Sequence, residues 1–195
     1  MEITKEDLIL SFWQKGANNC ASIALIKASI EVFGLNNVFD LSHNGDEYKA
    51  ILKNDNEVFF NQQNLNKSII IGSFQKSKDL TESKLELYKK IKDYAEICFV
   101  IMVANCAKIE NIDFDKALKK LSNGANARFV SKYLGLEKHA SKAFRRKDHL
   151  EGMIAWIHSP WRKHVVYMSQ GVFDFYGVIS KKTRKFPKRI QFKTL

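Results

Sequence analysis

Features that define several large classes of protein are missing from this chain of 195 residues. It has no run of eighteen apolar residues, which is about the length that a membrane-spanning helix needs. It has only two prolines, so long disordered linkers are not expected. Residues 1–7 are acidic and lack the basic start and apolar centre of a signal peptide. We therefore expect a cytoplasmic protein without a membrane span, and export by a route that cleaves no signal stays open.

Cysteine is also scarce. The three cysteines, at positions 20, 98 and 106, are odd in number and widely spaced, so they are not expected to form a disulfide framework. Cys98 and Cys106 lie in an apolar helical run and are expected to be small core residues. The cysteines and histidines show no zinc-ligand spacing, and no glycine-rich phosphate-binding loop occurs. The sequence therefore indicates neither a metal nor a nucleotide cofactor.

The positive charge is confined to one part of the chain. The formal net charge is +11. Residues 138–195 hold fourteen Lys and Arg against three acidic residues, whereas the charges of residues 1–137 cancel. This asymmetry favours an acidic partner, such as nucleic acid, an anionic surface or an acidic protein. A solvated surface without a partner is the alternative.

The apolar pattern predicts helices first and strands later. Helices are expected over residues 20–33, 81–106, 114–121 and 126–134. Strands are expected over residues 48–52, 58–60, 69–71, 153–157, 164–168, 172–176 and 188–192. Residues 8–13 form an apolar lead-in, and Asn19 is the expected N-cap of the first helix. This order favours an α+β fold with an antiparallel sheet.

Cys20 stands at the start of the first predicted helix, directly after loop 16–19. The dipole and free N–H groups of a helix N-terminus favour an anion, so this position is expected to lower the thiol pKa and favour a nucleophilic thiolate. Gln14 precedes Cys20 by six positions. A side-chain amide there can donate to an oxyanion together with the backbone N–H of Cys20. A structural role for Cys20 in the core is the competing interpretation.

His164 begins an apolar strand, and Asp174 lies on the strand that follows a short turn. A histidine base needs an acceptor that orients its second nitrogen, and Asp174 is the candidate. With Gln170 at the centre of the turn, His164 and Asp174 are diagonal neighbours on one face. A register shifted by one residue places them on opposite faces. His158 is a competing base.

The Gln14-x5-Cys20 spacing before a buried helix, and the late His164 and Asp174 hairpin, resemble the papain-like cysteine peptidases. The Gln14 and Cys20 segment is similar to that of the calpain branch of these peptidases. The short interval from His164 to Asp174 is similar to that of the small bacterial papain-fold toxins and deamidases. The resemblance covers residues 11–34 and 150–178; Asn19 and Ala21 depart from the residues that usually flank the cysteine. It implies one domain over residues 1–195, in which a helix headed by Cys20 packs on a C-terminal antiparallel sheet. Residues 38–137 are then an inserted hairpin and helical region, and 181–195 a basic C-terminal segment.

The resemblance also implies a function. Cys20 attacks an amide carbonyl, His164 shuttles the proton, Asp174 orients His164, and Gln14 helps to hold the oxyanion. The substrate is then a protein or peptide, no cofactor is needed, and protease, deamidase and transamidase chemistry share this machinery. Two alternatives stay open: an inactive papain-like binding module, and a nucleic-acid-binding protein that uses its basic C-terminal third. The predicted partner-binding residues there are Lys181, Lys182, Arg184 and Lys185.

Overall fold

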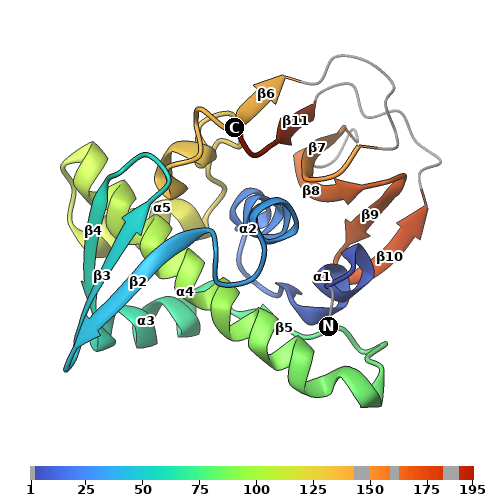
Figure 1. The fold of residues 1–195 in the computed structure, drawn as a ribbon, viewed down its shortest axis with the longest axis horizontal. Helices are drawn as coiled ribbons and strands as arrows, with labels where there is room; N and C mark the ends of the chain where they lie inside the picture. The colour runs from blue at the N-terminus through green and yellow to red at the C-terminus, as the bar shows by residue number, and fades with distance from the viewer. Residues whose placement is uncertain (1–2, 143–149, 159–162, 182–188) are drawn as a thin grey trace.

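The structure is a computed structural model (Figure 1). Helix α2 (Cys20–Phe33) is the central element of its fold. The structure describes residues 3–142, 150–158, 163–181 and 189–195. Residues 21–30 of α2 are buried without interruption. A helix that is apolar on most of its surface is stable only when other elements enclose it. The predicted bounds of this helix are confirmed.

A six-stranded sheet packs on one side of α2, and β8 is the strand that contacts the helix most extensively. Its strands are β6 (Ala140–Lys142), β7 (Met153–His158), β8 (Lys163–Ser169), β9 (Val172–Phe175), β10 (Val178–Lys181) and β11 (Arg189–Phe192). The strand order is β10-β9-β8-β7-β11-β6, and each of these pairings is antiparallel. The predicted α+β class with antiparallel sheets is therefore confirmed.

Most of the remaining elements lie across α2 from this sheet, whereas α1 lies beside β10 (Figure 1). The helices are α1 (Lys5–Ser11), α3 (Gln62–Gly72), α4 (Leu85–Glu110) and α5 (Phe114–Ser122), with the 3₁₀ turns η1 (Glu82–Lys84) and η2 (Val130–Leu134). Two small antiparallel sheets are also present. In one, β1 (Trp13–Gln14) pairs with β5 (Phe74–Gln75). In the other, β3 (Glu47–Leu52) is the middle strand and pairs with β2 (Phe39–Asn44) and β4 (Glu57–Asn61). The predicted hairpin of residues 48–60 is present as β3 and β4.

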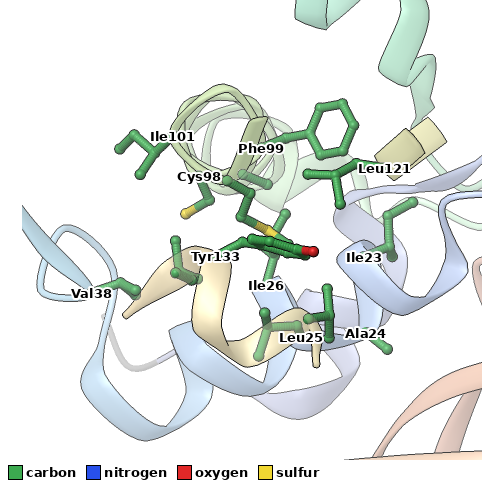
Figure 2. Packing of buried hydrophobic residues seen from close by; sticks show 14 of the residues in the cluster. Ile23, Ala24, Leu25, Ile26, Val38, Cys98, Phe99, Ile101, Leu121 and Tyr133 are labelled. Atoms are coloured by element: carbon green, nitrogen blue, oxygen red, sulfur yellow. The ribbon is translucent and has the colours of Figure 1, made fainter. Parts of the chain in front are cut away.

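The core is formed where α2 packs between the sheet and α4. Figure 2 shows Ile23 and Ile26 of α2 facing Cys98 and Phe99 of α4, with Tyr133 of η2 between them. This one cluster contains buried side chains from both ends of the chain. Cys98 and Cys106 have no exposed surface, which confirms that they are core residues. The packing fixes α2, and therefore Cys20, against the sheet.

Two predicted elements are wrong. The apolar triplet at residues 69–71 is not a strand but the last turn of α3. Asn61 and Asn64 cap the first turn of that helix reciprocally, and the capped helix extends through the triplet although Ile70 is 77% exposed. The helix predicted over residues 126–134 is reduced to the 3₁₀ turn η2.

The hairpin of β8 and β9 has a different register from the predicted one. Ser169 pairs with Val172, so Gln170 and Gly171 together form the two-residue connection. Both residues have positive φ, at 45° and 83°, which is the requirement of a type I′ turn. The pairing is therefore shifted by one residue from a turn centred on Gln170.

The last strand, β11, is an interior strand of the sheet, paired with β7 on one side and β6 on the other. Arg189 and Gln191 are both buried. Residues 189–192 of the basic segment are thus part of the folded core, whereas residues 193–195 are exposed. Among the described helices, none combines the length and apolar character needed to cross a membrane.

Candidate active site

Cys20 is the first residue of α2, as predicted. Asn19 precedes it as the N-cap, but its side chain makes no capping hydrogen bond, which corrects the predicted role. The amide Nδ2 of Asn19 instead donates to the carbonyl oxygen of Gly72 at 2.8 Å, and the side chain is completely buried. Asn19 therefore ties the start of α2 to the end of α3.

The thiol of Cys20 is partly buried beside strand β8. Burial raises the pKa of the Cys20 thiol above its ordinary value, because the thiolate loses hydration. The backbone N–H groups of Val165, Ala21 and Cys20 itself act in the opposite direction with smaller effect. The sequence predicted a lowered pKa from the helix terminus alone. Desolvation exceeds that stabilisation, so the thiol is protonated at neutral pH in this state.

His164 lies on β8 next to Val165, whose N–H acts on the Cys20 thiol. The imidazole stacks on the ring of Tyr176, with centroids 4.5 Å apart and an angle of 9° between the planes. The ring of Phe175 meets it edge-on at 6.5 Å. Aromatic rings at the end of β9 and in the turn after it therefore pack against the His164 ring and restrict its plane.

Cys20, His164 and Gln14 line the same two cavities. The smaller cavity has a volume of about 20 Å³ and also contacts Asp174 and Tyr176, among other residues. It has room for about one water molecule. The larger cavity, of about 640 Å³, extends over loop 15–18 and residues 123–124. That volume is typical of a small-molecule or side-chain binding site.

Gln14 is placed by the short pairing of β1 with β5, in which it lies opposite Phe74. Its oxygen Oε1 is buried and accepts no hydrogen bond in the described part of the chain. A buried amide oxygen without a donor carries a free-energy cost, which a binding partner or bound water relieves. The adjacent Trp13 donates through Nε1 to the carbonyl oxygen of Lys76 at 3.1 Å, which secures this wall.

Asp174 has a different partner from the predicted one. Its Oδ2 accepts a hydrogen bond from the ammonium of Lys27 at 2.6 Å, and its Oδ1 accepts from the backbone N–H of Gly177 at 2.7 Å. Because Met168 pairs with Phe173, alternation assigns His164 to the strand face of Phe173 and Asp174 to the opposite face. The predicted hydrogen bond between His164 and Asp174 is therefore corrected. Asp174 serves as the counterion of a buried lysine.

Other predicted residues are accounted for as far as the structure describes them. Lys181, at the end of β10, is exposed, whereas Lys182, Arg184 and Lys185 lie outside the described residues. The side chain of His158, the competing base, is likewise not described. Within the described part of the chain, no three His, Cys, Asp or Glu side chains gather in a way that suits a metal ion.

Lys27 and Tyr176 were missed by sequence reasoning. A signal for Lys27 was present, because one lysine in a nearly uncharged, buried helix requires an acidic partner elsewhere. Tyr176 carried no comparable signal, since its place beside His164 depends on the hairpin register. Comparison of the chain with protein-family models, curated proteins and solved structures finds no match.

Proposed function

We propose that this protein is a papain-like cysteine hydrolase or acyl transferase that acts on amide bonds of a protein or peptide. Cys20 is the nucleophile, His164 its base, and Gln14 with the backbone N–H of Cys20 the oxyanion site. One observation carries the proposal: a thiol at a helix N-terminus, a histidine and a glutamine from three separate elements line the same cavities. A nucleophile and its base must lie in the same site for the base to take the proton of the nucleophile.

The raised pKa of Cys20 determines how the reaction begins. A neutral thiol is a poor nucleophile, so His164 accepts the thiol proton while Sγ bonds to the carbonyl carbon. The carbonyl oxygen becomes an oxyanion held by Gln14 and the Cys20 N–H. His164 then protonates the leaving nitrogen, the carbon–nitrogen bond breaks, and a thioester remains. Water or an amine releases the acyl group, giving hydrolysis, deamidation or transamidation.

Asp174 has no catalytic part in this proposal, because its two carboxylate oxygens bind Lys27 and Gly177. A second candidate is a papain-like binding module without turnover. Two observations favour it: the raised pKa of the Cys20 thiol, and the volume of only about 20 Å³ in the cavity that reaches Asp174. Both candidates use the same fold and the same larger cavity, so the reactivity of Cys20 distinguishes them.

Alkylation with iodoacetamide, followed site by site with mass spectrometry, tests the proposal. We expect Cys20 to react faster than the fully buried Cys98 and Cys106. In His164→Gln, the rate at Cys20 at neutral pH should fall by about tenfold or more, because a general base typically contributes 10²- to 10⁴-fold. The matched control His43→Gln changes an exposed histidine on β2 and should leave the rate unchanged. Equal rates in wild type and His164→Gln would reject the proposal in favour of the binding module.

A further inference from the structure

Lys27 and Cys20 point from α2 in the same direction. Lys27 follows Cys20 by seven positions, which is just under two helical turns. Its ammonium is completely buried and binds Asp174 of β9. It also donates to the carbonyl oxygen of Ile9 at 3.1 Å and lies 4.7 Å from the centre of the Phe12 ring. One buried cation thus joins α1, α2 and the sheet.

Asp174 links Lys27 to the turn between β9 and β10, because its carboxylate binds both Lys27 and the backbone N–H of Gly177. Phe175 pairs with Val178, so Tyr176 and Gly177 form a two-residue turn with φ of 55° and 79°. Positive φ is unfavourable for tyrosine and needs support from its surroundings. The hydrogen bond from the Gly177 N–H to Asp174 provides that support.

The turn is also packed closely against Trp13. A Cβ atom at Gly177 would lie 2.5 Å from Cδ1 of Trp13, so only glycine allows this approach. Trp13 in turn meets Tyr176 edge-on, with ring centroids 6.5 Å apart. Tyr176 is therefore held between Trp13 and the stacked imidazole of His164.

We propose that Lys27, Asp174 and Tyr176 are positioning residues for the base His164. The buried ion pair fixes the β9–β10 turn relative to α2, the turn fixes Tyr176, and the Tyr176 ring sets the plane of the imidazole beside Cys20. This inference rests on the proposed function of Cys20 and His164. It assigns an orienting role to a stacked ring supported by a buried charge pair, and Asp174 acts on His164 through that ring.

Two double variants distinguish the effect of the buried ion pair from that of the hydrogen bond to the Gly177 N–H, and neither leaves an unpaired buried charge. Lys27→Met with Asp174→Asn removes both charges and keeps an acceptor for the Gly177 N–H. Lys27→Met with Asp174→Leu removes both charges and that acceptor. Near-ultraviolet circular dichroism checks that each protein is folded. If the leucine pair does not fold, Lys27→Met with Asp174→Ala serves the same purpose with the same expectations.

The position of the ring is measured by nuclear magnetic resonance, independently of any activity. Stacking on Tyr176 shifts the imidazole protons of His164 upfield, and Tyr176→Leu shows the resonance positions without this effect. We expect both pairs to weaken the upfield shift, because both lack the buried ion pair, and the leucine pair to lose more of it, because it also lacks the acceptor for the Gly177 N–H. A leucine pair that keeps the full upfield shift overturns the inference, as does an asparagine pair whose shift equals that of wild type.

Alkylation of Cys20 separates this inference from the proposed function. In the leucine pair, the His164-dependent rate of Cys20 alkylation at neutral pH should fall about tenfold, which corresponds to about 1.4 kcal/mol in activation free energy. The rate of Cys20 alkylation at alkaline pH should stay unchanged. If the leucine pair loses the upfield shift but keeps the His164-dependent rate, the inference is overturned. If the shift is lost and wild type shows no His164-dependent rate, the Tyr176 contact stands and the proposed function fails.

Discussion

Lys27 and Asp174, 147 residues apart in the chain, form an ion pair of 2.6 Å inside the protein, where their side chains are 0% and 8% exposed. Desolvation of the lysine lowers its pKa, and the neighbouring carboxylate acts in the opposite direction. The attraction between two buried charges only partly offsets their loss of hydration, so each partner depends on the other. This dependence makes the pair sensitive to single substitutions and tolerant of paired ones.

Removing one partner is therefore expected to destabilise the fold severely. Lys27→Met or Asp174→Asn alone should lower the free energy of unfolding by roughly 3–5 kcal/mol, because an unpaired charge stays buried. The combined variant should recover most of that loss. Urea denaturation measures all three. Lys116→Met, which breaks an exposed ion pair with Asp113, is the control and should leave the midpoint unchanged. Additive losses in the combined variant would contradict the coupling.

The reactivity of Cys20 should depend on pH in two parts. Because burial raises the thiol pKa, the thiolate population, and with it the rate of alkylation, should keep rising through the alkaline range. A separate contribution near neutral pH should disappear in His164→Gln, while the alkaline part remains. Alkylation rates measured across the pH range in both proteins test this. A Cys20 rate that is already constant at neutral pH would mean that the thiol pKa is lowered.

Glu31 on α2 should make stability fall as pH rises. Burial raises the pKa of its carboxyl, although Oε1 accepts from Ser169 at 2.5 Å and Oε2 from the Gly152 N–H at 2.6 Å. Since the folded-state pKa lies above the unfolded one, the folded protein binds more protons between the two values. The contribution of Glu31 is therefore fully present below the unfolded pKa and is lost as pH rises through the folded pKa.

Substitution of Glu31 by glutamine tests this dependence. Glu31→Gln keeps the shape of the side chain and does not titrate, so the stability of wild type relative to this variant should decrease from acidic to neutral pH. Glu137→Gln, at an exposed position, is the control and should follow the wild-type profile. Urea denaturation over the pH range measures both. A constant difference between wild type and Glu31→Gln would show that Glu31 has the same pKa in both states.

Gly177 and Gly16 provide a matched test of the packed turn. Both have positive φ, at 79° and 83°, but a Cβ at Gly16 meets nothing within 4 Å, whereas one at Gly177 enters the Trp13 ring. Gly16→Ala should cost roughly 1–2 kcal/mol from backbone strain alone. Gly177→Ala should cost more, because Trp13 must also move. Equal losses in thermal unfolding would show that the contact with Trp13 yields easily.

The sequence by itself determined the elements whose signals are local. The apolar face and the following glycine predicted α2 from Cys20 to Phe33, and alternation predicted the strands β7, β8 and β9. The positions of Cys20 and His164 also followed, because each lies at the start of a predicted element, whereas Gln14 was found from its spacing to Cys20. These signals suffice because they depend on neighbours a few residues away.

Only the tertiary structure decided the partner of Asp174, the role of Asn19 and the direction of the Cys20 pKa shift. A change of one residue in the β8–β9 register moves Asp174 to the other strand face, and no local pattern distinguished the two registers. The thiol pKa depends on how much of Cys20 the sheet buries, and Asn19 on where α3 ends. These outcomes are set by contacts between segments far apart in the chain, whose strength depends on burial and geometry that exist only once the fold has formed.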